Sequence, residues 1–389
     1  MPFGVEEMFF SKTDERGVIE DFNSVFVRIS GFSGDELHGA PHKILRHPDM
    51  PKAVFWLLWN GLRNGQAVGA YVKNKTKDGK YYWVFALAAP VTGGYFSVRI
   101  KPTSDMHSQV VALYKEIRAA ELAEKVSAED SAKRLLHRLQ DLGFPNYGWF
   151  QSAAYSLEFA ARRRALKAPT MMDVTNTEMA SELTQELQKE LRALASEFDN
   201  AEILTANMKI FAAKLHGGRA TINEIAKNYD LMLRDIKSHL KSLVMPLKVG
   251  GIWETPGGKR AAFMLCGYHL LDEVVADYEG DAMQEAGAAD TTHIQALRAG
   301  YKLQSDRAVN DCVRSALTIQ RRIEFLLRMV LGLSTIRIAC RVEAGTLRQS
   351  AQGLDTIVGR LDEFQDKIEE RMVKIQELAT SIVNCIGKS

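Results

Sequence analysis

The sequence is poor in cysteine and close to electrical neutrality. Its four cysteines stand far apart and no two form a CxxC pair; they are Cys266, Cys312, Cys340 and Cys385. This pattern argues against structural zinc and is typical of a reduced, cytoplasmic protein. The formal net charge is +2. Such a balanced charge gives no reason to expect nucleic acid as a partner.

Long hydrophobic runs are missing as well. No stretch reaches the ~18–20 apolar residues that a membrane-spanning helix needs. The nearest candidate, FLLRMVLGLSTIRIAC, contains Arg328 and Arg337, and each would cost about 2.5–3.5 kcal/mol at the bilayer centre on insertion scales. We therefore expect a packed helix there and no membrane span. The N-terminus has no basic segment followed by an apolar one, so we expect no signal peptide and a cytoplasmic location.

Residues 1–104 contain the strand-like segments. MFFSKT and VIEDF flank the turn DERG and predict a hairpin. Short helices follow, with Asn23 as an N-cap and Ser33 and Glu36 as a capping box. KAVFWLLWNGLRNG predicts a longer helix, and VGAYVKNKT, YYWVFALAAPV and YFSVRIKP predict three more strands. This order predicts an α+β domain with a five-stranded antiparallel sheet, helices on one face and a pocket between them.

Helical periodicity dominates the rest of the chain. Three apolar seams that step by three or four residues begin at Met179, Ile222 and Leu354. Each seam needs a partner helix, so we expect a long all-α bundle or coiled coil that forms a homodimer. We predict a helical linker and bundle at 105–245, an irregular loop at 246–262 and a C-terminal helical hairpin at 263–389.

A stiff polar loop, APHKILRHPDMPKAVFW, begins at Ala40. Its three prolines fix the backbone and remove hydrogen-bond donors. The same stretch gathers two histidines, an arginine and an aspartate. We predict that the loop holds these side chains in one geometry at the mouth of the pocket.

The run that contains RHPDMP, VKN and YYWV closely resembles the PAS sensory domain of bacterial aerotaxis receptors. The resemblance covers roughly a quarter of the chain, from about Phe9 to Pro102. In that family the PAS domain binds FAD non-covalently and senses the redox state of the electron-transport system. The resemblance implies FAD-binding positions in the three motifs; they are Arg46, His47, Asp49, Asn74 and Trp83.

These residue types suit a flavin dinucleotide. Arg46 can hold phosphate through two hydrogen bonds, and Asn74 has the donor and the acceptor that a flavin ring edge needs. Trp56, Trp59 and Trp83 could wall an apolar pocket. Trp56 and Trp59 stand three apart on one predicted helix, a spacing more typical of core packing than of cofactor contact.

Two other interpretations of the loop stay open. A rigid loop without a ligand would pair Arg46 with Asp49, and a haem-binding domain would use His42 or His47 as the iron ligand. One position departs from the family, because Val68 stands where aerotaxis receptors carry a tryptophan before the VKN strand.

Near the C-terminus, VLGLSTIRIACRVEA from Val330 to Ala344 has a faint resemblance to the signalling hairpin tip of methyl-accepting chemotaxis proteins. The matching positions are Leu331, Leu333, Ala339 and Arg341. The resemblance implies a degenerate chemotaxis signalling module with a histidine kinase or coupling protein as partner. The alternative is a helical bundle whose apolar face alternates in this way by chance.

The sequence as a whole predicts a cytoplasmic, non-enzymatic sensor of redox state or oxygen. No P-loop, HExxH or nucleophile-elbow pattern is present. The first alternative is a cofactor-free PAS scaffold that mediates dimerisation and protein–protein interaction. The second is a flavoenzyme, for which the sequence offers no clear acid or base.

Overall fold

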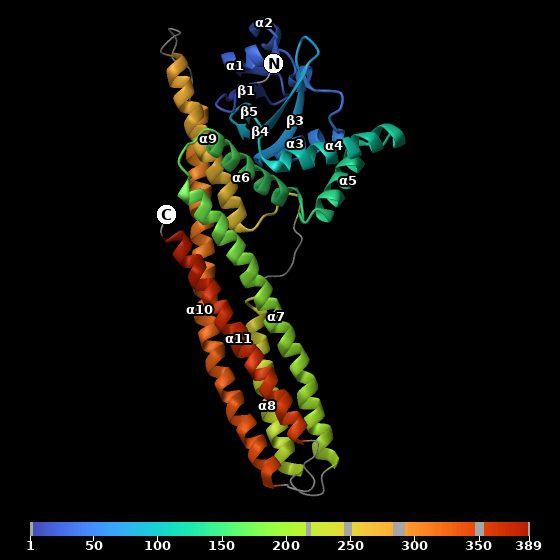
Figure 1. Cartoon of the computed structure of the whole chain (residues 1–389), viewed down its shortest axis with the longest axis vertical. Helices are drawn as coiled ribbons and strands as arrows, with labels where there is room; N and C mark the ends of the chain where they lie inside the picture. Colours follow the sequence, from blue (N-terminus) through green and yellow to red (C-terminus); the bar gives the residue numbers. More distant parts are fainter. Residues whose placement is uncertain (1–2, 215–218, 245–250, 283–291, 347–353, 388–389) are drawn as a thin grey trace. The chain divides into compact units, whose positions relative to one another are not determined.

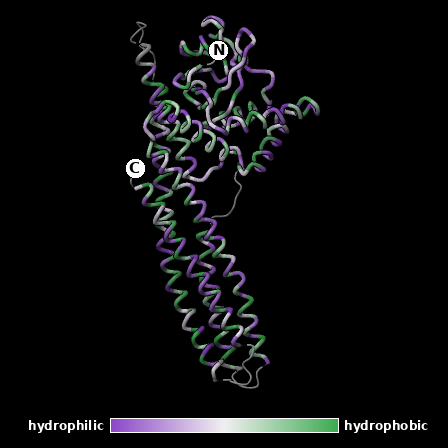
Figure 2. The backbone as a smooth tube through the Cα atoms, in the orientation of Figure 1, coloured by the Kyte–Doolittle hydropathy of each residue, from purple (hydrophilic) through white to green (hydrophobic). Residues whose placement is uncertain are grey.

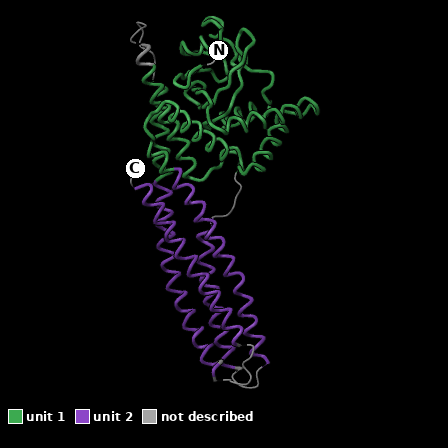
Figure 3. The backbone as a smooth tube through the Cα atoms, in the orientation of Figure 1, with its two compact units in different colours: residues 1–177, 249–309 green, residues 178–248, 310–389 purple. Residues whose placement is uncertain are grey.

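A computed structural model describes residues 3–214, 219–244, 251–282, 292–346 and 354–387. The chain forms two compact units (Figure 3). Unit 1 contains residues 1–177 and 249–309, and unit 2 contains residues 178–248 and 310–389. The predicted boundary after residue 104 lies inside unit 1. Residues 246–250 of the predicted loop lie outside the described residues, and its end overlaps a helix that begins at Gly257.

Unit 1 contains the five-stranded antiparallel sheet that the sequence predicts. Its strands run in the order β2-β1-β5-β4-β3. Figure 1 labels β1, β5, β4 and β3 of this sheet. Their bounds are Phe9–Asp14 for β1, Ile19–Phe22 for β2, Val68–Lys75 for β3, Tyr81–Val91 for β4 and Gly94–Ile100 for β5. All pairs are antiparallel, and only the short β2 has a shifted register against β1.

Short helices cover one face of this sheet. They are α1 (Ser24–Ser30), α2 (Gly34–Leu37), the 3-10 turn η1 (His42–Leu45) and α3 (Lys52–Arg63). The side chain of Asn23 accepts a hydrogen bond from Phe26 N, and Ser33 with Glu36 forms a full capping box. These two contacts confirm the predicted helix starts.

The opposite face of the sheet is covered too, which the sequence analysis did not foresee. The covering helices are α4 (Asp105–Glu124), α6 (Tyr147–Ala165) and α9 (Gly257–Ala282), while α5 (Ala128–Asp141) packs beside α3. The Tyr147 hydroxyl donates to Gly69 O at 3.0 Å, and the Phe85 ring stacks on Tyr155 at 5.4 Å. β4 is buried at most positions because both of its faces are covered.

Glu158 of α6 connects this helical layer to the end of the sheet. Its side chain is fully buried. Its carboxyl oxygens accept hydrogen bonds from the Tyr71 hydroxyl at 2.7 Å, Thr103 N at 2.6 Å, and Ser104 N and Oγ at 3.0 and 2.6 Å. Thr103 and Ser104 lead directly into α4, so one side chain fixes β3, α4 and α6 to one another.

Unit 2 is a bundle of long helices from a single chain. Its residues belong to α7 (Met172–Lys214), α8 (Arg219–Lys241), α10 (Thr292–Thr346) and α11 (Leu354–Ile386). Apolar and polar positions alternate along these helices (Figure 2). One apolar core joins all four, including Leu191, Tyr229, Ile323 and Ile368.

Each predicted seam therefore finds its partner helices within the same chain. Ion pairs add to this packing: Arg371 of α11 lies 2.8 Å from Glu190 of α7, and Arg337 of α10 lies 2.9 Å from Asp362 of α11. The seams by themselves do not require a second copy of the chain. The homodimer stays a prediction.

The short segment 251–256, which precedes α9, packs against α3 through Trp253. The Trp253 indole N–H donates to Asn60 Oδ1 at 3.0 Å, and its ring lies 5.3 Å from that of Tyr147. A Cβ on Gly61 would stand 2.9 Å from the Trp253 ring and 2.5 Å from Val68 Cγ2. Glycine at position 61 thus permits close contact between α3, β3 and Trp253.

We expect Gly61→Ala to destabilise unit 1 by about 1–3 kcal/mol, because the added methyl overpacks this contact. Gly300→Ala is the matched control, since Gly300 also lies within a helix and a Cβ there meets nothing within 4 Å. That control should gain about 0.5–1 kcal/mol from helix propensity. Urea unfolding followed by fluorescence measures both, and equal effects of the two variants would contradict the close packing.

Within the described ranges, every helix is either too short or too polar to serve as a membrane span.

Candidate functional site

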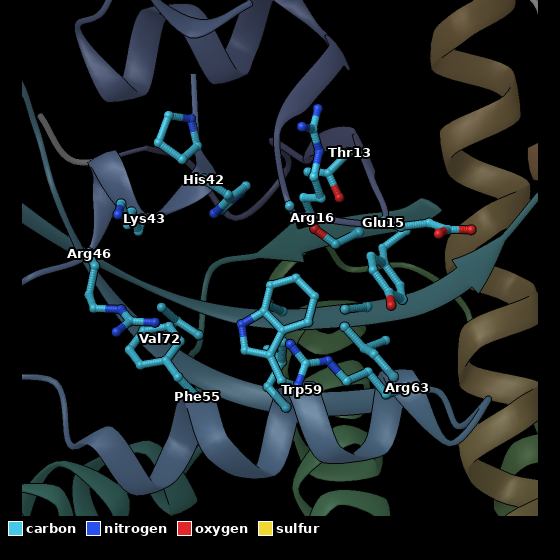
Figure 4. A pocket seen from close by; sticks show the side chains of 18 of the residues that line it. Thr13, Glu15, Arg16, His42, Lys43, Arg46, Phe55, Trp59, Arg63 and Val72 are labelled. Atoms are coloured by element: carbon cyan, nitrogen blue, oxygen red, sulfur yellow. The ribbon is translucent and has the colours of Figure 1, made fainter. Parts of the chain in front are cut away.

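A cavity of about 330 Å³ lies between the sheet and the short helices of unit 1 (Figure 4). The β1–β2 turn, η1 and α3 surround it, and the inner faces of β3, β4 and β5 form its floor. Apolar walls come from α3 and β4; these residues are Phe55, Leu58, Trp59, Leu62, Ala86 and Ala88. The polar lining includes Thr13, Glu15, Arg16, His42, Lys43, Arg46, Arg63, Asn74, Ser97 and Arg99.

The rim of the cavity is strongly cationic. Arg16, Lys43, Arg46 and Arg63 all line it and are exposed to solvent. Glu15 is the one carboxylate among the described lining residues. Arg16 pairs with Asp14 at 2.9 Å, whereas no ion pair with a described carboxylate involves Arg46. Such a rim favours an anionic ligand group, because arginine holds phosphate through paired hydrogen bonds.

The proline-bounded loop is fixed to β3 by its backbone. Arg46 forms an isolated antiparallel bridge with Asn74, and His47 N donates to Lys73 O at 3.3 Å. Met50 is buried beneath the loop, with Lys73 N 3.2 Å from its sulfur. This arrangement aims Arg46 at the cavity, where its guanidinium lies 3.4 Å from the centre of the Phe55 ring.

His47 and Asp49, two of the predicted FAD-binding residues, do not line the cavity. Asp49 Oδ2 lies 2.6 Å from Lys73 Nζ and 3.4 Å from His47 Nδ1. The hydrogen bond from Lys73 holds the pKa of Asp49 below its usual value. The alternative salt bridge between Arg46 and Asp49 is therefore wrong, because Lys73 is the cation that Asp49 contacts.

Trp83, another predicted FAD-binding residue, lies on the other face of the sheet. Successive residues of a strand point to opposite faces, and the cavity takes the even-numbered positions Ala86 and Ala88 of β4. The Trp83 ring instead lies 5.2 Å from His107 and 6.3 Å from Tyr114, both on α4. Trp83 thus contacts the helix that leaves the sheet.

Asn74 and Arg46 are the predicted residues that the structure brings together at the cavity. Asn74 is buried, and its Nδ2 has no hydrogen-bond acceptor among the residues that the structure describes. The hydroxyl of Tyr82, opposite it across the strand pair, is a described group close to this amide, and the two do not meet with the geometry of a hydrogen bond. A buried donor without an acceptor is costly, so this amide suits a ligand that supplies one.

Trp59 lies across the cavity, with its indole pointing from α3 toward the β1–β2 turn (Figure 4). Its ring meets the Tyr95 ring edge-on at 5.4 Å, and a Cβ on Gly17 would stand 3.0 Å from it. Trp59 is therefore a wall of the cavity, and it also packs against the core of unit 1, as its spacing favoured. Trp56 and Val68 do not line this cavity, and Val68 is buried against Gly61.

Two lining residues were missed as a pair by the sequence analysis. Arg99 is 3% exposed, and its Nη2 lies 2.6 Å from Nε2 of His42. Burial, with the charges of Arg99 and Arg46, lowers the pKa of His42 to about 3, so the imidazole is neutral and accepts this hydrogen bond. The alternation in YFSVRIKP could have shown that Ser97 and Arg99 share the inner face.

This contact bears on the haem alternative. His42 Nε2 is occupied by Arg99, and His47 faces Asp49 outside the cavity. A haem iron needs a histidine nitrogen that is free to bind it. Among the described lining residues, His42 is the histidine, and its Nε2 is already hydrogen-bonded.

Residues 19–95 match the family described as the PAS fold. The N-terminal domain is a PAS domain. It is similar to the aerotaxis receptor of Escherichia coli strain K12, with 37% identity over 130 residues, which are 32% of this chain and 26% of the receptor. The chain thus spans about a quarter of the length of that relative.

Solved structures similar to the PAS domain include two bacterial examples. One is the LOV domain of the blue-light activated histidine kinase from Erythrobacter litoralis EL346, with 18% identity over 24% of this chain and 90% of that one, at a TM-score of 0.22. The other is a PAS domain from Colwellia psychrerythraea, with 20% identity over 25% of this chain and 86% of that one, at a TM-score of 0.22.

The segment compared with a chemotaxis hairpin tip, Val330 to Ala344, lies near the end of α10. Leu331, Ile338 and Val342 are exposed there, by 64, 56 and 63%. Leu333 is buried in the bundle, and Arg341 pairs with Asp362 at 2.5 Å. Three of these apolar side chains therefore face solvent on one stretch of helix.

Proposed function

We propose that the PAS domain binds a flavin dinucleotide and that the protein is a redox or oxygen sensor. The observation that carries this proposal is the cavity itself, which joins apolar walls to an exposed cationic rim and a buried unpaired amide. Its volume of about 330 Å³ lies within the ~300–1,000 Å³ range of cofactor and ligand sites. The similarity to an aerotaxis receptor agrees with this assignment.

In this proposal each part of the lining has a separate task. Arg46 and Arg63 bind the pyrophosphate at the rim, and Phe55 and Trp59 pack against the rings. Asn74 donates to a ring carbonyl, which satisfies its buried amide. The flavin, when bound, supplies reversible electron uptake. His47 and Asp49 act indirectly, because their contacts with Lys73 hold the Arg46 loop on β3.

The proposed output runs from the sheet into the helices. Tyr71 and Trp83 of the sheet contact α4 through His107, and Glu158 holds the start of α4. A second contact leads from α3 to Trp253. A change in the position of α3 or β3 would therefore reach α4, α6 and the segment around Trp253 that precedes α9.

We further propose a non-catalytic role and a signalling partner of the chemotaxis type. Among the described lining residues, Glu15 has the carboxyl group and His42 the imidazole that could act as acid or base. His42 already accepts a hydrogen bond from Arg99. That leaves no pair of free groups for acid–base turnover.

The exposed stripe of Leu331, Ile338 and Val342 is the proposed contact for a histidine kinase or coupling protein. Binding measurements with those purified proteins test this part.

We expect Arg46→Ala to lower the flavin content of the purified protein about tenfold or more, because a charge-assisted hydrogen bond contributes roughly 1.5–3 kcal/mol. The visible spectrum of the folded variant measures this loss. Arg28→Ala is the control, since Arg28 is an exposed arginine of the same domain that pairs with Glu7 away from the cavity.

A wild-type protein that stays colourless after incubation with FAD would favour the cofactor-free scaffold instead. Val68 supports the scaffold, because it replaces the family's tryptophan and does not line the cavity. Flavin retained unchanged in Arg46→Ala would remove Arg46 from the site.

A further inference from the structure

Arg99 is a buried cation whose charge no described carboxylate balances. Its guanidinium donates to Ser11 Oγ at 3.1 Å and to Ser97 O at 3.4 Å, and its third contact is His42 at 2.6 Å. The rings of Phe9 and Phe26 lie 5.6 and 5.3 Å from it. All of these groups are neutral, and no ion pair with a described residue involves Arg99.

The charge on Arg99 persists in this surrounding. Burial lowers the pKa of Arg99 to about 10, which still leaves the group protonated at neutral pH. Neutral His42 accepts a hydrogen bond from Arg99 but supplies no negative charge. Because an isolated charge in a low-dielectric interior is unfavourable, the folded domain retains a positive potential at this point of the cavity.

We propose that Arg99 is a selective anion-binding group of the cavity, which holds the bound flavin more tightly in its reduced, negatively charged form than in its neutral oxidised form. The inference rests on the proposed function. Two electrons from an external reductant and one proton from water convert the neutral ring into a ring with one negative charge. A fixed cation without a protein counter-ion stabilises that product and not the starting ring.

The rim cations do not perform this task equally well. Arg16, Lys43, Arg46 and Arg63 are exposed, so water and salt screen their charges. Arg99 is 3% exposed, and the cavity floor around it is formed by strands. A charge acts over a longer range in such a place because the local dielectric constant is low. The exposed cations of the rim thus bind the phosphates, whereas Arg99 in the floor stabilises the negative charge of the reduced ring.

The test compares the midpoint potential of the bound flavin in the wild type, Arg99→Met, Arg99→Lys and Arg28→Met, titrated with dithionite. The shift from free flavin gives the ratio of affinities for the reduced and oxidised forms. We expect Arg99→Met to lower this affinity ratio at least tenfold. For a two-electron couple, that change lowers the midpoint potential of the bound flavin by about 30 mV. Arg99→Lys should retain most of it. Arg28→Met, which removes an exposed arginine of the same domain, should not change it.

A second measurement separates binding from folding. Arg99→Met without flavin should melt at the same temperature as the wild type or about 2–4 °C higher, because it removes an unbalanced buried charge. A clear fall in melting temperature would make Arg99 a structural residue and overturn the inference.

The outcomes also separate the inference from the function on which it rests. If the wild type binds no flavin, both fail. If the wild type binds flavin and Arg99→Met has the same potential, only the role of Arg99 fails. A folded Arg99→Met that holds neither form of the flavin contradicts selectivity as well.

Discussion

Glu158→Ala should lower the free energy of unfolding of unit 1 by on the order of 4 kcal/mol, since each buried donor left without an acceptor costs about 1–3 kcal/mol. The carboxyl group is fully buried and accepts four hydrogen bonds, which come from Tyr71, Thr103 and two groups of Ser104. Alanine would leave these donors facing apolar neighbours. The same change should free the start of α4 from α6 and from β3.

Tryptophan fluorescence during urea unfolding measures this loss, because the five tryptophans all belong to unit 1. Glu129→Ala on α5 is the matched control, since its side chain is 56% exposed and pairs with Lys133. That control should change stability by less than about 1 kcal/mol. A small effect of Glu158→Ala would show that the helices do not depend on this carboxyl group.

The second large effect is expected in the bundle, where Ile368→Ala should cost about 2–5 kcal/mol through lost burial and a cavity. Ile368 is fully buried in the core that joins the four helices of unit 2. Val373→Ala on the same helix is the control, since Val373 is 48% exposed and should contribute little. Far-UV circular dichroism follows the helices.

The bundle also predicts that melting does not depend on protein concentration, because the partners of each seam belong to one chain. A melting temperature that rises with concentration would instead favour the homodimer that the seams suggested. In that case the loss caused by Ile368→Ala would grow on dilution.

Local patterns were sufficient for the elements of the PAS domain. The capping box at Ser33 and Glu36, the N-cap at Asn23 and the three-strand meander follow from short-range hydrogen bonding and period-two alternation. The motif RHPDMP located the loop at the cavity, and Arg46 and Asn74 do line it.

Other parts of the site depended on contacts between distant residues. Asp49 pairs with Lys73, which is 24 positions away in the sequence, and His42 is hydrogen-bonded to Arg99, which is 57 positions away. Trp83 carries a family motif but belongs to the strand face opposite the cavity. The register of a strand decides such a placement, and a one-residue shift would reverse it.

The sequence by itself determined the element types of the PAS domain, the PAS motif and the apolar seams, because these depend on spacing along the chain. Tertiary structure alone decided which motif residues reach the cavity, that helices cover both faces of the sheet and that the seams close within one chain. The physical reason is that burial and charge pairing follow proximity in space. A buried arginine and a neutral histidine acquire their properties only when the fold brings them together.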